Sequence, residues 1–292
     1  MDNLAKHIKL QFPEYLQLMR INKPIGIFLL LWPTLWALWV AAEGVPHVLN
    51  LVIFVLGVVF MRSAGCVIND YADRDFDLHV RRTQDRPLTS GRVTTKEALL
   101  LFATLVFTSF VLVLFTNLET IYMSCGALFL AALYPFMKRY TYFPQVFLGA
   151  AFAWAVPMAF TAETQSVSEV TWLLYAATLL WTIAYDTQYA MVDREDDLKI
   201  GIKSTAILFG DMDNIAIISL QVLTLCTLLL AANQLSAGIF FYLGLLAATG
   251  FFVYQYTLTQ HRDRDMCFKA FLNNHWVGAS IFTGIFIDYL VR

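Results

Sequence analysis

The sequence predicts an all-α, polytopic membrane protein in which nine transmembrane helices form a bundle, and three observations support this fold class. Hydrophobic residues make up 59% of the 292 residues and charged residues only 14%, whereas soluble domains carry about 25% charged residues. The apolar residues gather in nine stretches, each near the roughly 20 residues that a helix needs to cross the hydrocarbon. The basic residues lie at alternate connections between these stretches, which is typical of membrane proteins.

The chain is expected to form a single domain over residues 1–292. The first part of the chain comprises residues 1–21. Within it, the pattern of residues 3–21 predicts a surface helix that lies in the bilayer interface and is interrupted near Pro13. This part lacks a cleavage site after an apolar core, so no removable signal peptide is expected. In the bundle, residues 22–292, Pro135 shortens the fourth apolar run. The spans are expected at about 24–42, 48–68, 98–116, 119–137, 143–161, 170–192, 212–232, 236–256 and 270–290.

The charges of the connections predict the orientation of the bundle. With nine spans and a cytoplasmic N-terminus, all 20 Lys and Arg residues except the terminal Arg292 fall on the cytoplasmic side. This bias supports the span count, because omitting one helix would scatter the charges over both faces. The charged segments that follow the second and sixth spans therefore lie at the same face, in a weak internal repeat of span, acidic motif and basic loop.

Acidic residues at helical spacing stand out in two segments. Asn69, Asp73 and Asp77 are four residues apart and share one face if the second span continues as a helix. Stacked carboxylates repel one another unless a cation binds, and oxygen-only ligand sets favour Mg²⁺ or Ca²⁺. The four cysteines show no C-x-x-C spacing, so neither zinc nor a disulfide framework is indicated. The candidate metal ligands are Asn69, Asp70, Asp73, Asp77, Asp186, Asp193 and Asp197.

Basic residues flank both acidic segments. Their side chains suit phosphate oxygens that metal ions leave uncompensated, and a membrane-embedded body favours a lipid-linked phosphate or diphosphate substrate. The alternative is that these charges are solvated and only fix the topology. Acidic residues at the bilayer boundary argue against that alternative, because burying them is costly. The basic residues are Arg74, Arg81, Arg82, Arg86, Arg194, Lys199 and Lys203.

These motifs resemble a known family. Residues 69–91, NDYADRDFDLHVRRTQDRPLTSG, resemble the signature of the UbiA prenyltransferase superfamily, and residues 186–197, DTQYAMVDREDD, resemble its second aspartate-rich motif. Nine helices and cytoplasmic motifs also fit, so the resemblance covers essentially the whole chain. Within the family, three segments look most like bacterial 4-hydroxybenzoate polyprenyltransferases of ubiquinone synthesis: INKPIG (21–26), LLWPTLWALWVA (30–41) and KIGIKSTAILFG (199–210).

The resemblance implies an Mg²⁺-dependent enzyme of the bacterial inner membrane. The donor would be an all-trans polyprenyl diphosphate whose allylic cation attacks 4-hydroxybenzoate ortho to its hydroxyl, giving 3-polyprenyl-4-hydroxybenzoate. These two substrates and the lipid bilayer are the expected partners, with no nucleic acid and no obligate protein partner. Metal and diphosphate would be held by Asn69, Asp73, Asp77, Asp193 and Asp197, with Arg82, Arg86, Lys199 and Lys203 on the diphosphate.

The acceptor carries a carboxylate that needs a cation. Lys138 and Arg139, on the connection after the fourth span, are the candidates, with Arg139 first because a guanidinium matches a carboxylate bidentately. The pair fits an anchor of the positive-inside kind equally well. Tyr189 lies one helical turn from Asp186 and from Asp193, and Asp193 is a candidate base. The candidate catalytic residues are Asp73, Asp77, Asp193, Asp197 and Tyr189.

Alternative functions remain at this stage. A CDP-alcohol phosphotransferase also uses paired aspartates, but in one contiguous motif that begins Asp-Gly and is absent here. An ion-coupled transporter would place its acidic residues near the middle of its spans, whereas these lie at span ends beside basic clusters. Within the family, the acceptor could instead be a naphthoate, homogentisate or haem.

Overall fold

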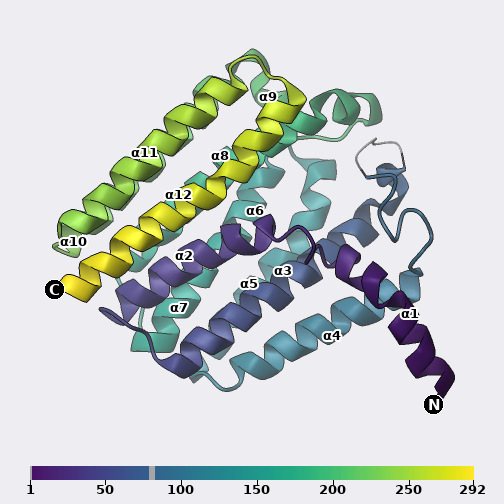
Figure 1. Ribbon diagram of the computed structural model, residues 1–292, viewed down its shortest axis with the longest axis horizontal. Coiled ribbons are helices and arrows are strands. Elements are labelled where there is room, and N and C mark those ends of the chain that lie inside the picture. The colour runs from purple at the N-terminus through teal and green to yellow at the C-terminus, as the bar shows by residue number, and fades with distance from the viewer. Residues whose placement is uncertain (1, 79–82) are drawn as a thin grey trace.

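The computed structural model describes residues 2–78 and 83–292, the side chains of residues 2–8, 75 and 76 excepted. Every regular element in these ranges is helical, as predicted. Long helices form the body of the molecule, and α1 projects from one corner (Figure 1). The helices are α1 (Asp2–Leu18), α2 (Ile25–Ala41), α3 (Val48–Asp77), α4 (Thr95–Val113), α5 (Leu118–Tyr140), α6 (Pro144–Ala153), α7 (Ala155–Thr164), α8 (Glu169–Ile200), α9 (Thr205–Phe209), a 3₁₀ turn at Gly210–Met212, α10 (Asp213–Gln234), α11 (Ile239–Thr259) and α12 (Arg264–Val291).

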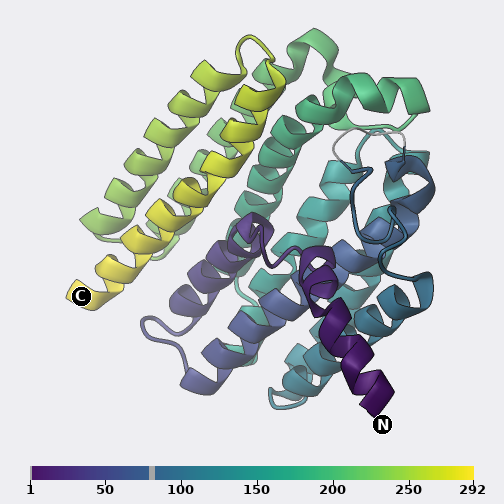
Figure 2. The same ribbon diagram turned by 45° about the vertical axis from the view of Figure 1, so that its right-hand side comes forward.

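Two apolar clusters hold the bundle together. The larger one joins α2, α7, α8 and the α10–α12 side of the molecule, and its centre is the fully buried Trp36 stacked on Trp181 with ring centroids 5.4 Å apart. Trp36 also donates its indole N–H to the Gly278 carbonyl of α12 (3.1 Å). The smaller cluster packs Leu18 of α1 against Ala64 of α3 and residues of α4. Figures 1 and 2 show α10–α12 on one side of the bundle and α3–α5 on the other.

The helix ends form two separate polar faces. At one face lie the ends of α3, α5 and α8, together with the α11–α12 connection, where Arg264 pairs with Glu195 (2.8 Å). At the other face the α4–α5 connection meets α7, and Asn117 donates to the Thr161 carbonyl (2.6 Å). The segments that follow the second and sixth predicted spans therefore meet at one face, as the sequence predicts.

The predicted count of nine spans is not confirmed. Six helical segments of the described chain are long and apolar enough to cross a membrane. Of the remaining predicted spans, α2 is apolar but has only 17 residues. The other two, α8 and α12, have 32 and 28 residues but carry polar and charged side chains along their length. The six segments are Val48–Arg74, Thr95–Val113, Leu118–Tyr140, Pro144–Thr164, Thr205–Gln234 and Ile239–Thr259.

The helices near three prolines differ from the predicted spans, and two of these prolines, Pro13 and Pro135, were expected to interrupt or shorten a helix. The helix α1 runs through Pro13 without interruption, because the carbonyl that loses its partner belongs to the exposed Lys9 and can be solvated. Similarly, α5 runs through Pro135 to Tyr140, so that Lys138 and Arg139 lie in its last turn and not in a loop. The fifth predicted span is instead divided at Trp154 into α6 and α7. There Pro157 cannot donate to the Ala153 carbonyl.

Glycines set the close approach of α11 and α12, which leads to a first prediction. A Cβ on Gly284 would lie 2.8 Å from the Phe240 carbonyl oxygen. We expect Gly284→Ala to force the helices apart and to lower the free energy of unfolding by about 1–3 kcal/mol. Thermal unfolding in detergent, followed by tryptophan fluorescence, measures this change. The matched control is Gly250→Ala on α11, where a Cβ meets no atom within 4 Å. Equal stability of the two variants would contradict the close packing.

Candidate active site

One cavity of about 880 Å³ opens at the polar face that contains the ends of α3, α5 and α8. It brings together all of the predicted metal ligands, although the two acidic segments are more than 100 residues apart in the sequence. Arg86, Lys138, Tyr189 and Lys203 also line it. The acidic residues that line it are Asp70, Asp73, Asp77, Asp85, Asp186, Asp193 and Asp197, with Asn69 beside them.

The acidic residues of α3 share one face because the helix continues as far as Asp77. The side chains of Asp70, Asp73 and Asp77 are buried, with exposed fractions of 1%, 2% and 6%. Thr83, six residues after Asp77, donates its hydroxyl to the Asp77 carbonyl (2.9 Å). This hydrogen bond returns the chain towards α3 and places Arg86 over the acidic face.

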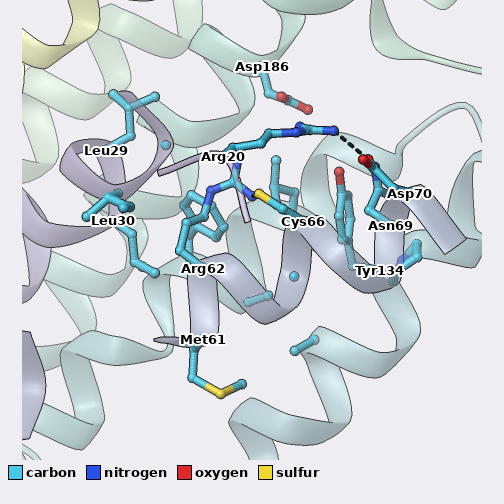
Figure 3. Close-up of a pocket in the computed structure, with 18 of the residues that line it drawn as sticks. Arg20, Leu29, Leu30, Met61, Arg62, Cys66, Asn69, Asp70, Tyr134 and Asp186 are labelled. Carbon is cyan, nitrogen blue, oxygen red and sulfur yellow. Dashed lines mark hydrogen bonds and ion pairs between the residues drawn. The ribbon is translucent and has the colours of Figure 1, made fainter. Parts of the chain in front are cut away.

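Each of these three acids has a basic partner. Arg86 contacts both Asp70 (2.9 Å) and Asp77 (2.7 Å). Arg20, from the linker between α1 and α2, contacts the same Asp70 oxygen at 2.6 Å (Figure 3). Lys138, from the last turn of α5, pairs with Asp73. Buried carboxylates require such compensation, so three elements outside α3 converge on its acidic face.

The second acidic set extends from inside the bundle to its polar face. Asp186, Asp193 and Asp197 are partly buried and belong to the long helix α8. This helix ends where Gly201 adopts a left-handed conformation (φ 73°), which glycine tolerates without strain. The following segment turns back to α5, and the Lys203 backbone N–H donates to the Lys138 carbonyl (3.2 Å). In this way α8 and α5 are fixed side by side around the cavity.

The donor atoms around the cavity suit a hard divalent cation. They are oxygens, and one of them, Asp73 Oδ1, is buried without a hydrogen-bond partner. Within residues 2–78 and 83–292, no group of three or more His, Cys, Asp or Glu side chains is arranged to hold one metal ion. Mg²⁺ typically takes one or two carboxylates and completes its shell with water and phosphate oxygens. The residues therefore fit Mg²⁺ that arrives with a diphosphate.

Of the predicted basic residues, some do not line the cavity and Lys203 lines it while contacting the protein itself. Lys199 is 73% exposed, pairs with Asp196 and does not line the cavity. Lys203 lines the cavity and donates to the Tyr140 carbonyl (3.3 Å). Arg139 donates to the Ala72 carbonyl and is not among the lining residues, so its expected contact with a ligand has no support from its position. The predictions for Arg81 and Arg82 lie outside the described residues.

Arg262, in the connection between α11 and α12, belongs to a buried ion cluster. Asp213 at the start of α10 is fully buried and accepts hydrogen bonds from Arg194 of α8 (2.6 Å) and from Arg262 (3.1 Å). These hydrogen bonds raise the pKa of Arg262 above its usual value. Arg194 is therefore a structural residue and not the diphosphate ligand that its position in the sequence suggested.

Away from the acids, the cavity is apolar. Val106 and Phe110 of α4, Leu128 of α5 and Phe152 of α6 contribute to its wall. Tyr189, on the α8 side, packs against Phe271 with ring centroids 4.7 Å apart. The cavity thus combines a charged end with a long apolar wall, as required for an amphipathic ligand with an anionic head.

Two residues of the cavity wall, Arg20 and Arg62, were not predicted as site residues from the sequence. From the sequence, Arg20 and Arg62 contribute only to the bias of basic residues towards the cytoplasmic side. The structure places both in the cavity wall, Arg62 well inside α3. Helical spacing was the available signal for Arg62, because it precedes Asp70 by eight residues and so lies near the same helix face.

The fold and the site define a membrane-embedded, all-helical protein with a carboxylate-rich cavity for an anionic, lipid-like ligand. The model of the UbiA prenyltransferase family matches residues 30–278. The chain belongs to this family, which confirms the resemblance noted from the sequence.

Two relatives match nearly the whole chain. The 4-hydroxybenzoate octaprenyltransferase of Ectopseudomonas mendocina (strain ymp) is 65% identical over 279 residues, which are 96% of this chain and 94% of that protein. The 4-hydroxybenzoate octaprenyltransferase of Hahella chejuensis (strain KCTC 2396) is 59% identical over 292 residues, covering 100% and 97%.

Solved structures share the fold. The apo structure of a UbiA homolog from Aeropyrum pernix K1 has a TM-score of 0.79 and 24% identity, covering 90% of this chain and 97% of that one. The structure of a UbiA homolog from Archaeoglobus fulgidus bound to GPP and Mg²⁺ has a TM-score of 0.72 and 18% identity, covering 93% and 99%.

The double pairing of Asp70 gives a second prediction. Asp70→Asn leaves Arg20 and Arg86 without the carboxylate they share, and we expect the free energy of unfolding to fall by about 3 kcal/mol. Chemical unfolding in detergent without Mg²⁺ measures this loss. The exposed Asp211 provides the control, because Asp211→Asn should change stability by less than about 0.5 kcal/mol. A stability of Asp70→Asn equal to that of the control would show that the two ion pairs contribute nothing.

Proposed function

We propose that this chain transfers an all-trans polyprenyl group from polyprenyl diphosphate to the carbon ortho to the hydroxyl of 4-hydroxybenzoate. The observation that carries the proposal is the joint lining of one cavity by the acids of α3 and α8, with an apolar wall next to them. The charged end suits a diphosphate and the apolar wall suits a prenyl chain. The choice of acceptor is supported by relatives named 4-hydroxybenzoate octaprenyltransferase that match nearly the whole chain.

The residues proposed to hold Mg²⁺ are those that face the cavity with oxygen donors. When bound, Mg²⁺ would neutralise the diphosphate and stabilise its departure. Asp70 has a different proposed role, because Arg20 and Arg86 already share one of its oxygens. It would position these guanidinium groups for the diphosphate. The proposed ligands are Asn69, Asp73, Asp77, Asp193 and Asp197, with Asp186 deeper in the same wall.

The reaction proceeds by ionisation of the donor and capture of the carbon by the aromatic ring. The allylic C–O bond breaks with its electron pair going to the diphosphate, whose growing charge Arg86 and Lys203 would offset. The ring carbon forms the new C–C bond, and the proton on that carbon then leaves to restore aromaticity. Asp193 is the proposed base, since it lines the cavity on α8. The apolar walls exclude water, which would otherwise capture the allylic cation.

The proposed location is the bacterial inner membrane, with nine spans and the cavity on the cytoplasmic face. Two observations support it. The six long apolar segments describe a multi-pass protein. Basic residues lie before α2 and at the polar ends of α3, α5, α8 and α11, which is the face where the cavity opens, as expected for a cytoplasmic surface.

The third prediction tests the reaction itself. Membranes that contain the protein, incubated with octaprenyl diphosphate, Mg²⁺ and ring-labelled 4-hydroxybenzoate, should form labelled 3-octaprenyl-4-hydroxybenzoate, detected by extraction and mass spectrometry. EDTA should abolish the product and added Mg²⁺ should restore it, because the carboxylates alone repel the diphosphate. Membranes without the protein are the control. Transfer to a naphthoate, homogentisate or haem in place of 4-hydroxybenzoate would refute the acceptor and leave the prenyl transfer standing.

The fourth prediction tests whether both acidic segments are needed. Asp73→Ala and Asp193→Ala should each lower kcat by at least about 10³-fold, since each removes a charge that is used in the transition state. Product formation in membranes, normalised to the amount of correctly inserted protein, measures the effect. Asp265→Ala, an exposed residue in the first turn of α12, should keep normal activity. Near-normal turnover of either cavity variant at low Mg²⁺ would contradict a site shared by α3 and α8.

A further inference from the structure

The short segment between α8 and α9 brings Lys203 to the wall of the cavity. Its backbone is attached to the bundle at three points. The Ile202 N–H donates to a carbonyl in the last turn of α8 (3.0 Å), and the Lys203 N–H donates to one in the last turn of α5 (3.2 Å). The Thr205 N–H, at the start of α9, donates to Oε1 of the Gln145 side chain (3.1 Å). The first two attachments join backbone groups, whereas the third depends on one side chain.

The helix that carries this side chain has a fixed position. The α6 sequence, PQVFLGAAFA, is apolar except for Gln145, which is only 5% exposed and lines the cavity. Pro144 occupies the start of α6, where its restricted φ suits a helix. A Cβ on Gly149 would lie 3.0 Å from the Leu179 carbonyl oxygen, so α6 lies close against α8. The amide of Gln145 is therefore presented to Thr205 from a rigid part of the bundle.

The hydrogen-bond chain continues from Thr205 into α8. The Thr187 hydroxyl donates to the Ile183 carbonyl (2.7 Å), and it also lies 2.7 Å from the Thr205 hydroxyl. A hydroxyl has a single proton to donate. Because Thr187 already uses its proton, Thr205 is the donor in this pair. Both threonines are fully buried, so the start of α9 is fixed to α6 through Gln145 and to α8 through Thr187.

The position of Lys203 depends on this start of α9. Lys203 lies two residues before Thr205, and Ser204 between them caps α9 with its side chain. A shift of the first turn of α9 would therefore move Lys203 as well. The Lys203 ammonium donates to the Tyr140 carbonyl (3.3 Å) and lines the cavity. A cation stabilises developing charge only when it is aimed at the place where that charge appears.

We propose that Gln145 is a positioning residue for the prenyl transfer, which holds the start of α9 so that Lys203 faces the departing diphosphate; this inference rests on the proposed function. Without the Gln145 oxygen, the buried Thr205 N–H would lose its acceptor, which is unfavourable. The first turn of α9 would then shift to regain a partner, and Lys203 would move with it. Stabilisation of the diphosphate would weaken, while binding of the aromatic acceptor would not change.

The fifth prediction concerns the loss of this hydrogen bond. Gln145→Met keeps the size of the side chain but has no oxygen acceptor, and it should lower kcat by about 10- to 100-fold, because small misplacements of a stabilising group are costly. It should leave KM for 4-hydroxybenzoate unchanged. It should also weaken binding of pyrophosphate with Mg²⁺ about 10-fold, the effect of one charge-assisted hydrogen bond. Product formation in membranes measures turnover, and calorimetric titration of pyrophosphate and Mg²⁺ into the protein in nanodiscs measures binding.

The matched control is a second buried glutamine. Gln221 is also 5% exposed and donates a hydrogen bond of 3.0 Å to Gln255, but it does not line the cavity. Gln221→Met should bind pyrophosphate as the wild type does, even where it lowers stability. An equal loss of pyrophosphate binding in Gln145→Met and Gln221→Met would mean that any disturbed amide has this effect, and it would overturn the inference.

A second pair of variants removes the N–H in place of its acceptor, and tests the same hydrogen bond should Gln145→Met fail to fold. Proline lacks the N–H and is tolerated at the first position of a helix. The extended backbone of Ser204 (φ −152°, ψ 163°) is compatible with a following proline. Thr205→Pro should therefore lower kcat as Gln145→Met does. Thr205→Val loses the same hydroxyl but keeps the N–H, and should retain most of the activity.

Combination with Lys203→Met separates positioning from general damage. If Gln145 acts through Lys203, the double variant Gln145→Met, Lys203→Met should have the same kcat as Lys203→Met alone. The effect of Gln221→Met should instead multiply with that of Lys203→Met. An effect of Gln145→Met that is undiminished in the Lys203→Met background would make Gln145 a structural residue and overturn the inference. A wild type that does not prenylate 4-hydroxybenzoate would refute the proposed function, and the pyrophosphate titrations would still test the positioning of Lys203.

Discussion

Carboxylates buried in a membrane bundle need positive partners, and this requirement organises the polar face of the protein. Asp70, Asp73 and Asp77 are almost entirely inaccessible, and water cannot compensate their charge there. The partners come from three separate elements, namely the α1–α2 linker, the segment after α3 and the last turn of α5. Compensation of charge thus determines which parts of the chain meet around the cavity.

A second buried acid does the same for the other half of the bundle. Asp213 binds Arg194 of α8 and Arg262 of the α11–α12 connection. These contacts fix the polar end of α8, the helix that carries the second acidic set. The connections at this face are therefore parts of the scaffold, and their charges serve the position of α8 as well as the topology of the chain.

The sequence was informative where backbone geometry alone decides position. Helical spacing placed Asn69, Asp73 and Asp77 on one face, because the repeat of the α-helix is fixed. The charge bias of the loops placed the ends of α3 and α8 at the same face. The partners of the basic residues could not be predicted, because long side chains reach several acids and only packing selects among them. Thus Lys199 points away from the cavity, while Arg20 enters it.

The place of Arg62 in the cavity wall was not predicted, for a different reason. Hydropathy averages a charged residue with its apolar neighbours, so the predicted span 48–68 contains Arg62 without indicating that its side chain lines a cavity inside the bundle. The structure shows α3 continuing two turns beyond Arg62 to Asp70 and on to Asp77. A long helix that carries charges inside the bundle is the feature that a search for about 20 apolar residues misses.

The arrangement of charge along the cavity also accounts for the order of its parts. A prenyl diphosphate has its charge at one end and a long apolar chain at the other, so it can align with a cavity that is charged at the polar face and apolar along α4 and α5. The acids at the polar face are already paired with cations, and these same cations suit phosphate oxygens. If a metal-bound diphosphate binds, the cations can pair with its phosphate oxygens and the carboxylates with the metal. No charge would then be left uncompensated.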